Sequence, residues 1–229
     1  MTIASSLNQI LPQRFLGFIP LFIGVEVVLG ITILNKAGGV YGILSIITGH
    51  PLNFWQWFYN ILAIMTIPFY ISALIHLKDK PRNARKLSLA TVVYVIDTFV
   101  GFFYTIYFIY FWFSSEDVSE EDLGKRASST NSQDLSAQSA SLARELYVTA
   151  STTIVVSAVR FYFTLVILSF TKALLKQDAS EQKYNERTRS PDEEDEEVIS
   201  ATTGIVGEWK KFVFDLEIKS KDFLVNFFK

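Results

Sequence analysis

The chain has 229 residues, half of them hydrophobic, and a formal net charge of −2. It contains no cysteine, which excludes disulfides, thiolate nucleophiles and cysteine metal sites, and it shows no basic face that would suit a nucleic acid. Residues 1–113 carry seven Lys/Arg and three Asp/Glu, whereas residues 114–229 carry fourteen and twenty. This division predicts a membrane-embedded first part and a second part in which membrane and polar segments alternate.

The first predicted membrane helix covers residues 15–34, which are apolar except for Glu26 and Thr32. About 20 helical residues cross a hydrocarbon core of about 30 Å. The segment contains a carboxylate and no closely following small-residue cleavage site, so we interpret it as a retained span rather than a signal peptide. The short apolar run at 40–47 is then either a re-entrant piece or an ordinary loop packed on the helix ends.

Two more spans are predicted at 54–75 and 87–113, separated by a short basic segment. Five basic residues and one acid lie between 76 and 86, which predicts that this loop faces the cytosol. A fourth span is predicted at 146–171. With four spans both termini are cytosolic, and the 36–53 link and the loop at 114–145 are luminal.

Polar segments separate and follow the last span. Residues 114–145 are acidic and rich in Ser, Ala and Gln, so we predict a disordered luminal loop. Residues 1–176 form the four-span membrane domain, and residues 177–203, with six consecutive acids at 192–197, form an acidic disordered tail. Residues 204–229 carry an apolar stripe at helical spacing, which predicts a cytosolic amphipathic helix lying in the headgroup plane.

Three charges lie inside predicted spans: Glu26, Asp97 and Arg160. Counted from the cytosolic ends, their depths agree to within about one helical turn. A charge near the bilayer centre is costly unless it is paired or faces a cavity, so we expect Arg160 to pair with at least one of the carboxylates. Such a network would fix helix packing or contact a partner helix or lipid headgroup; a proton or ion pathway is the least favoured interpretation.

The sequence does not favour an enzyme. Its two histidines, His50 and His76, are predicted at opposite ends of one span, so they cannot share the site of a phosphatase-like lipid transferase. No acid cluster suggests the metal site of a CDP-alcohol transferase, and there is no nucleophile elbow. We therefore predict a non-catalytic protein without cofactor or metal.

Several segments resemble one fungal family, the regulatory, non-catalytic subunit of inositol phosphorylceramide synthase. The resemblance covers about 15–113 and 146–176 and is carried by FLGFIPL at 15–21, VEVVLGI at 25–31, LNK at 34–36, YGIL at 41–44, GHPL at 49–52, YVIDT at 94–98 and RFYF at 160–163. The predicted luminal link carries these signature residues: Asn35, Lys36, Tyr41, Gly42, Gly49, His50 and Pro51.

The resemblance implies a multi-pass Golgi membrane protein that binds a catalytic subunit, which transfers phosphoinositol from phosphatidylinositol to ceramide. Membrane lipids and a kexin-type protease are the other implied partners, and no nucleic acid is expected. The family also implies processing at a dibasic site, which here would be Lys125-Arg126. From the residues alone, a stand-alone membrane scaffold or sorting adaptor stays open as an alternative, and a small transporter is less favoured.

Overall fold

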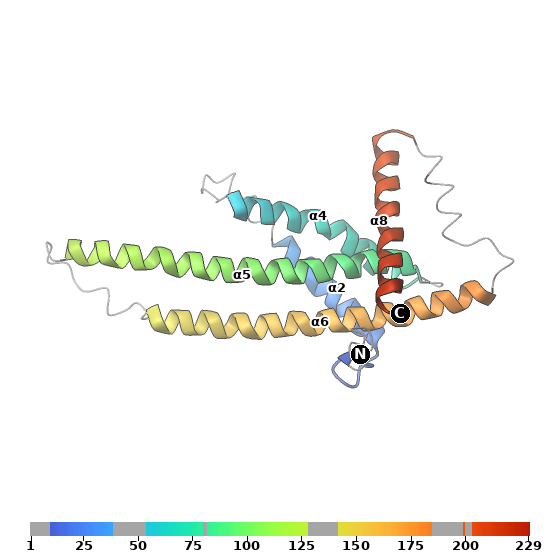
Figure 1. Cartoon of the computed structure of the whole chain (residues 1–229), viewed down its shortest axis with the longest axis horizontal. Helices are drawn as coiled ribbons and strands as arrows, with labels where there is room; N and C mark the ends of the chain where they lie inside the picture. The colour runs from blue at the N-terminus through green and yellow to red at the C-terminus, as the bar shows by residue number, and fades with distance from the viewer. Residues whose placement is uncertain (1–9, 39–53, 80–81, 128–141, 185–198, 200–202) are drawn as a thin grey trace. The chain divides into compact units, whose positions relative to one another are not determined.

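The computed structural model describes residues 10–38, 54–79, 82–127, 142–184, 199 and 203–229. The named elements of these residues are all helices, as predicted for an all-α protein (Figure 1): α2 (Leu21–Ala37), α4 (Phe54–His76), α5 (Ala84–Ala127), α6 (Leu142–Tyr184) and α8 (Ile205–Phe227). The chain divides into two compact units. Unit 1 contains Met1–Tyr94 and Phe163–Lys229, and unit 2 contains Val95–Tyr162.

Three of the described helices contain segments long and apolar enough to cross a membrane: Trp57–His76 in α4, Ala84–Phe111 in α5 and Leu146–Glu181 in α6. They correspond to the second, third and fourth predicted spans. Large apolar side chains on their surfaces, among them Phe103 and Ile154, are exposed, as is usual for side chains that face lipid.

The first predicted span has different bounds in the structure, because its first residues form a turn. Phe15 and Ile19 exchange two backbone hydrogen bonds of 2.8 and 2.9 Å, and Leu16 and Gly17 between them have positive φ angles of 50° and 84°. Pro20 then disfavours a helical conformation at the residue before it. The helix therefore begins at Leu21, not at residue 15, and its 17 residues span about 25 Å.

The turn is packed rather than loose. The Phe15 side chain is buried and lies so close to Gly24 that a Cβ on that glycine would be 2.6 Å from it. Its ring also contacts Phe163 of α6, with 6.3 Å between centroids, and the Ser169 hydroxyl donates to the Pro12 carbonyl at 2.6 Å. The segment before α2 is thus fastened to α6 within unit 1.

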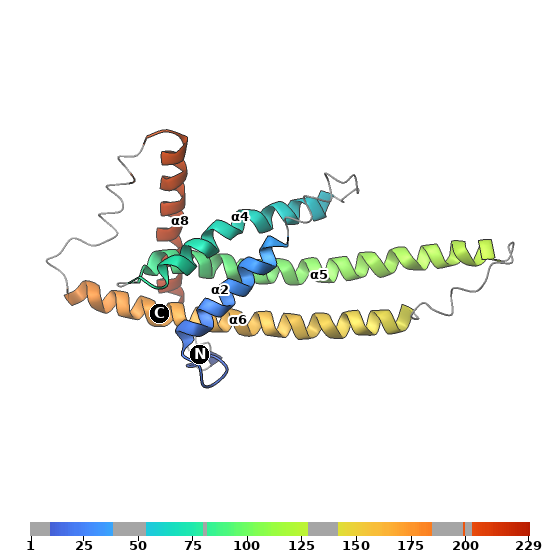
Figure 2. The same cartoon turned by 180° about the vertical axis from the view of Figure 1, so that it is seen from behind.

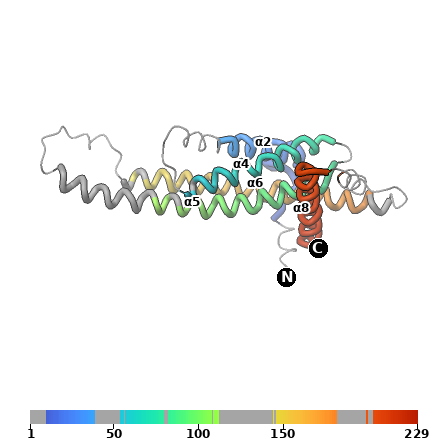
Figure 3. Tube along the Cα trace, turned by 90° about the horizontal axis from the view of Figure 1, so that it is seen from above, coloured from blue at the N-terminus to red at the C-terminus, as the bar shows by residue number. Residues whose placement is uncertain are grey.

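The core of unit 1 forms where α2 and α4 pack against each other and against parts of α5 and α6 (Figures 2 and 3). Buried residues include Val25, Val28 and Leu29 of α2, Ala63, Tyr70 and Ala73 of α4, Leu87 and Ala90 of α5, and Val166 and Ile167 of α6. A polar contact joins α5 and α6 inside this core, where the hydroxyl oxygens of Thr91 and Thr171 lie 2.7 Å apart.

α5 and α6 extend beyond the predicted membrane spans into polar sequence. α5 continues to Ala127 and α6 begins at Leu142, so much of the predicted disordered loop at 114–145 is helical, while residues 128–141 lie outside the described part. α6 likewise continues to Tyr184, eight residues into the predicted tail at 177–203. Hydrophobicity marks where a helix leaves lipid, but Glu, Lys, Gln and Leu favour a helix in water as well.

The predicted helix at 204–229 is present as α8, Ile205–Phe227. Within unit 1 it runs across the neighbouring helices rather than along them (Figure 1). Of the predicted apolar stripe, Ile205, Val206, Trp209, Phe212 and Phe223 are exposed, whereas Leu224 is buried. The other buried residues of α8 are Gly207, Phe214, Glu217 and Ser220. The face that packs onto unit 1 is therefore displaced from the centre of the stripe. That the exposed stripe lies in the headgroup plane stays a prediction.

Candidate functional site: a charged pair and a hydroxyl-lined cavity

Unit 2 contains an ion pair between α5 and α6. The Arg160 Nη2 atom donates to the Asp97 Oδ2 atom at 3.0 Å, and the side chains of Asp97 and Arg160 are 5% and 24% exposed. Both residues lie well inside the apolar segments of their helices. A charged pair in this setting neutralises two groups that would each be costly alone. The structure thus brings together two of the three charges that were expected to interact.

A glycine makes room for this pair. Gly101 lies one helical turn after Asp97 on α5, and a Cβ at this position would be 2.6 Å from the Arg160 Nη1 atom. The guanidinium consequently rests against the backbone of α5, where a larger residue would displace it. Asp97 and Gly101 are four residues apart, so both lie on the face of α5 that meets Arg160.

Glu26 is bound elsewhere, so the predicted three-residue network needs correction. Its Oε1 atom lies 2.7 Å from the Lys78 Nζ atom, directly after α4. The predicted depth of Glu26 assumed a helix from residue 15. Because α2 begins at Leu21, Glu26 is only about 8 Å from the helix start, within reach of the basic segment that follows α4.

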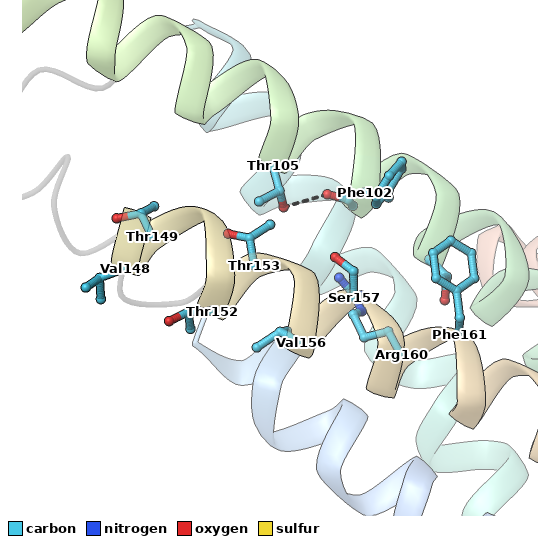
Figure 4. A pocket seen from close by; sticks show the side chains of 12 residues that line it. Phe102, Thr105, Val148, Thr149, Thr152, Thr153, Val156, Ser157, Arg160 and Phe161 are labelled. Atoms are coloured by element: carbon cyan, nitrogen blue, oxygen red, sulfur yellow. Dashed lines mark hydrogen bonds between the residues drawn. The ribbon is translucent and has the colours of Figure 1, made fainter. Parts of the chain in front are cut away.

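A cavity of about 360 Å³ lies beside the ion pair, entirely within unit 2. Figure 4 shows its lining, which comprises Thr98, Gly101, Phe102 and Thr105 of α5 and Val148, Thr149, Thr152, Thr153, Val156, Ser157, Arg160 and Phe161 of α6. Half of these residues carry hydroxyl groups, and Arg160 adds guanidinium N–H donors. The cavity can thus offer several donors and acceptors inside an otherwise apolar pair of helices. Sequence analysis did not single it out.

A second group of charges joins α8 to α5 and α6 within unit 1. The Arg85 Nε atom donates to the Glu217 Oε2 atom at 2.8 Å, and these side chains are only 2% and 8% exposed. The Arg85 guanidinium also lies 4.3 Å from the centroid of the Phe214 ring. Nearby, Lys221 pairs with Asp178 of α6 at 2.8 Å. Sequence analysis used Arg85 only as a topology signal, and no local pattern connects residues that are 132 positions apart.

His76 has a local structural role. Its Nδ1 atom lies 2.7 Å from the Ser72 carbonyl oxygen and its Nε2 atom 2.7 Å from the Lys86 Nζ atom. The Nδ1–H group can donate to the Ser72 carbonyl while Nε2 accepts from the Lys86 ammonium group. These two contacts join the end of α4 to the start of α5. His50 lies outside the described residues.

The remaining predicted residues are only partly described. Lys125 and Arg126 directly precede Ala127, the last residue of α5, so the candidate processing site lies in a helical turn. Asn35 and Lys36 belong to the last turn of α2 instead of the luminal link, and the buried Lys36 Nζ atom lies 5.4 Å from the centroid of the Tyr59 ring. The other signature residues of the link, at 41–51, lie outside the described part.

Comparison with known proteins gives consistent matches. Residues 14–178 match the family described as inositolphosphorylceramide synthase subunit Kei1. The chain is 41% identical over 175 residues to the inositol phosphorylceramide synthase regulatory subunit of Saccharomyces cerevisiae, covering 72% of this chain and 78% of that protein. It is 27% identical over 168 residues to the Schizosaccharomyces pombe protein of the same name, covering 71% and 68%. No solved structure matches the chain.

Proposed function

The chain belongs to the family of inositolphosphorylceramide synthase subunit Kei1, and we propose that it is the non-catalytic, regulatory subunit of that synthase. In this role it assists a catalytic partner that transfers phosphoinositol from phosphatidylinositol to ceramide. The observation that carries the proposal is the match over residues 14–178, which includes α2, α4, the membrane parts of α5 and α6, and the Asp97–Arg160 pair.

Association with the partner is tested by purification. A tagged chain, solubilised in mild detergent, should co-purify with a larger multi-span protein, and the eluate should form inositol phosphorylceramide from ceramide and phosphatidylinositol. An unrelated membrane protein of similar size with the same tag is the control. Recovery of the chain without a partner or activity would instead favour the stand-alone scaffold or sorting adaptor.

The proposed topology has four spans and cytosolic termini in the Golgi membrane. α4, α5 and α6 supply three spans, and α2 supplies the fourth. At about 25 Å, α2 is short for a bilayer of about 30 Å, but thinning of the bilayer and flanking residues accommodate such differences. The exposed Leu16 and Phe18 of the preceding turn are suited to the interface. The basic residues between α4 and α5 support a cytosolic position for that loop.

Cleavage by a kexin-type protease after Lys125-Arg126 is part of the same proposal. A protease binds its substrate in an extended conformation, so the last turn of α5 must unwind before it can be cut. In a cell that contains the protease, the wild-type chain should yield two fragments and Arg126→Ala a single full-length band. Identical band patterns would eliminate the processing site.

A further inference from the structure

The cavity in unit 2 has a size that suits part of a lipid. Its volume of about 360 Å³ falls in the range of small-molecule sites, roughly 300–1,000 Å³. That volume accommodates a polar head and the adjoining carbons but not two long chains. Phe102, Val148, Val156 and Phe161 supply apolar surface next to the polar groups. The lining therefore resembles the boundary between a lipid head and its hydrocarbon.

The hydroxyl groups of α6 are placed to bind something other than their own helix. Helical Ser and Thr commonly donate to a carbonyl one turn earlier. Thr105 does so to Gly101 at 2.7 Å, and Thr91 does so to Leu87 at 2.8 Å. In the described part of the chain, Thr153 and Ser157 form no such bond, and both point toward α5 in Figure 4. Their hydroxyls are available as donors and as acceptors.

The charge of the cavity indicates which lipid class it fits. Arg160 supplies the positive charge, and the Asp97 carboxylate beside it supplies a negative one at 3.0 Å, so the pair has no net charge. A phosphate would have to compete with Asp97 for the guanidinium and would approach the Asp97 carboxylate. Neutral amide and hydroxyl groups can bond to the hydroxyls of Thr153 and Ser157 without disturbing the pair.

We propose that this cavity binds the head of a neutral lipid that carries amide and hydroxyl groups, the class to which ceramide belongs. The choice of ceramide rests on the proposed function, since ceramide is the acceptor in that reaction. The site retains or presents the neutral substrate beside the catalytic partner, while the phosphorylated lipids are bound elsewhere in the complex.

The test uses the purified full-length chain without its partner, in nanodiscs of neutral phospholipid containing a photoactivatable, clickable ceramide. Ser157→Leu fills the cavity, and Ser151→Leu is its matched control, because Ser151 lies on the same helix but does not line the cavity. Thr153→Val removes one hydroxyl at nearly constant volume. Its control is Thr66→Val in α4, where the hydroxyl donates to the Ala63 carbonyl at 2.7 Å.

Wild type and both controls should label equally, and Ser157→Leu should lose labelling. Thr153→Val should weaken labelling about fivefold, the effect of roughly one hydrogen bond. Unlabelled ceramide should compete, diacylglycerol with matched chains should compete less well, and phosphatidylinositol should not compete. Absence of labelling in the wild type, equal labelling of Ser157→Leu and Ser151→Leu, equal competition by all three lipids, or the strongest competition by phosphatidylinositol would each overturn the inference.

The labelling experiment and the co-purification experiment can fail independently of each other. A chain that co-purifies with active synthase but is not labelled refutes the lipid site and leaves the subunit role intact. A chain that is labelled specifically but binds no synthase retains the lipid site and refutes the subunit role. Sedimentation of each variant as a single species before labelling distinguishes loss of the site from loss of the fold.

Discussion

At the scale of single residues, the position of the Arg160 guanidinium depends on two neighbours along α5. Asp97 provides the opposite charge, and Gly101 provides the space. An arginine inside a membrane helix is tolerated only when both conditions hold, because its donors need partners and its bulk needs room. The two requirements can be separated by mutation.

Gly101→Ala tests the space. The added Cβ would push the guanidinium away from Asp97, which costs about 1.5–3 kcal/mol for a charged hydrogen bond and is partly offset by about 1 kcal/mol of helix propensity. The thermal midpoint of the detergent-solubilised chain should therefore fall. Gly30→Ala in α2 is the control, since nothing lies within 4 Å of its new Cβ. Equal midpoints for the two variants would contradict the packing argument.

The charges themselves are tested by a double-mutant cycle. Asp97→Leu leaves Arg160 in place without the Asp97 carboxylate, and breaking such a pair costs about 3–5 kcal/mol. Arg160→Leu should cost less, because a carboxyl group can take up a proton and become neutral. The double variant should recover part of the synthase complex lost in Asp97→Leu. Strictly additive losses in detergent recovery would show that the pair contributes nothing to assembly.

At the scale of helices, α8 is fastened by a buried pair that involves the first turn of α5. Arg85 lies where the partial positive charge of a helix N-terminus makes a cation unfavourable, and Glu217 compensates for it. Most of the predicted apolar stripe is exposed, and only Leu224 of the stripe is buried on the docked face. A membrane surface could contact the stripe without displacing the docked face.

Glu217→Ala should therefore release α8. The natural chain has no cysteine, so a single introduced cysteine reports local exposure without background. Ser220→Cys is buried on the docked face and should react with a maleimide on the order of tenfold more slowly than the exposed Asp222→Cys. Adding Glu217→Ala should remove this difference. If Ser220→Cys stayed protected, the apolar contacts together with the Lys221–Asp178 pair would be sufficient to hold the helix.

The existence and type of these helices could be predicted from sequence, but not all their ends. Hydropathy identified α4, α5 and α6 because their apolar runs are long. It misplaced the start of α2 because residues 15–20 are as apolar as the helix, although Gly17 and Pro20 favour a turn. It also ended α6 early, where polar pairs such as Gln177 and Glu181, bonded at 2.8 Å, continue the helix in water.

The candidate site was predictable to a similar extent. Depth predicted only that Arg160 pairs with Asp97 or Glu26, because the costs of unpaired charges favour such a contact, and it did not choose between the two carboxylates. Glu26 instead lies beside Lys78, because α2 begins six residues later than the predicted span. The Arg85–Glu217 pair and the hydroxyl-lined cavity depend on which faces of distant helices meet, and a single sequence does not contain that information.

At the scale of the whole molecule, α5 and α6 contribute residues to both units. Unit 1 contains the buried Arg85–Glu217 pair, and unit 2 contains the partly buried Asp97–Arg160 pair. The family match ends at residue 178, whereas the docking of α8 extends unit 1 to residues beyond that match. The C-terminal helix is therefore part of the same unit as α2, α4 and the unit 1 portions of α5 and α6, although it lies outside the matched region.

Sidedness is the testable property at this scale. The five basic residues between α4 and α5 predict that this loop and both termini face the cytosol. In sealed Golgi vesicles, a protease should digest a tag after Lys229 and leave a tag at Ser129 intact until detergent is added. Digestion in the reverse order would invert the topology and place the docked face of α8 in the lumen.

The contact between Lys221 and Asp178 closes a loop of chain that contains all six acids at 192–197. Because this contact is intramolecular, the effective concentration of α8 at its docking face is set by the connecting chain and not by the concentration of the protein. Cutting the chain between residues 178 and 221 would remove this advantage, because α8 would then have to dock as a separate molecule.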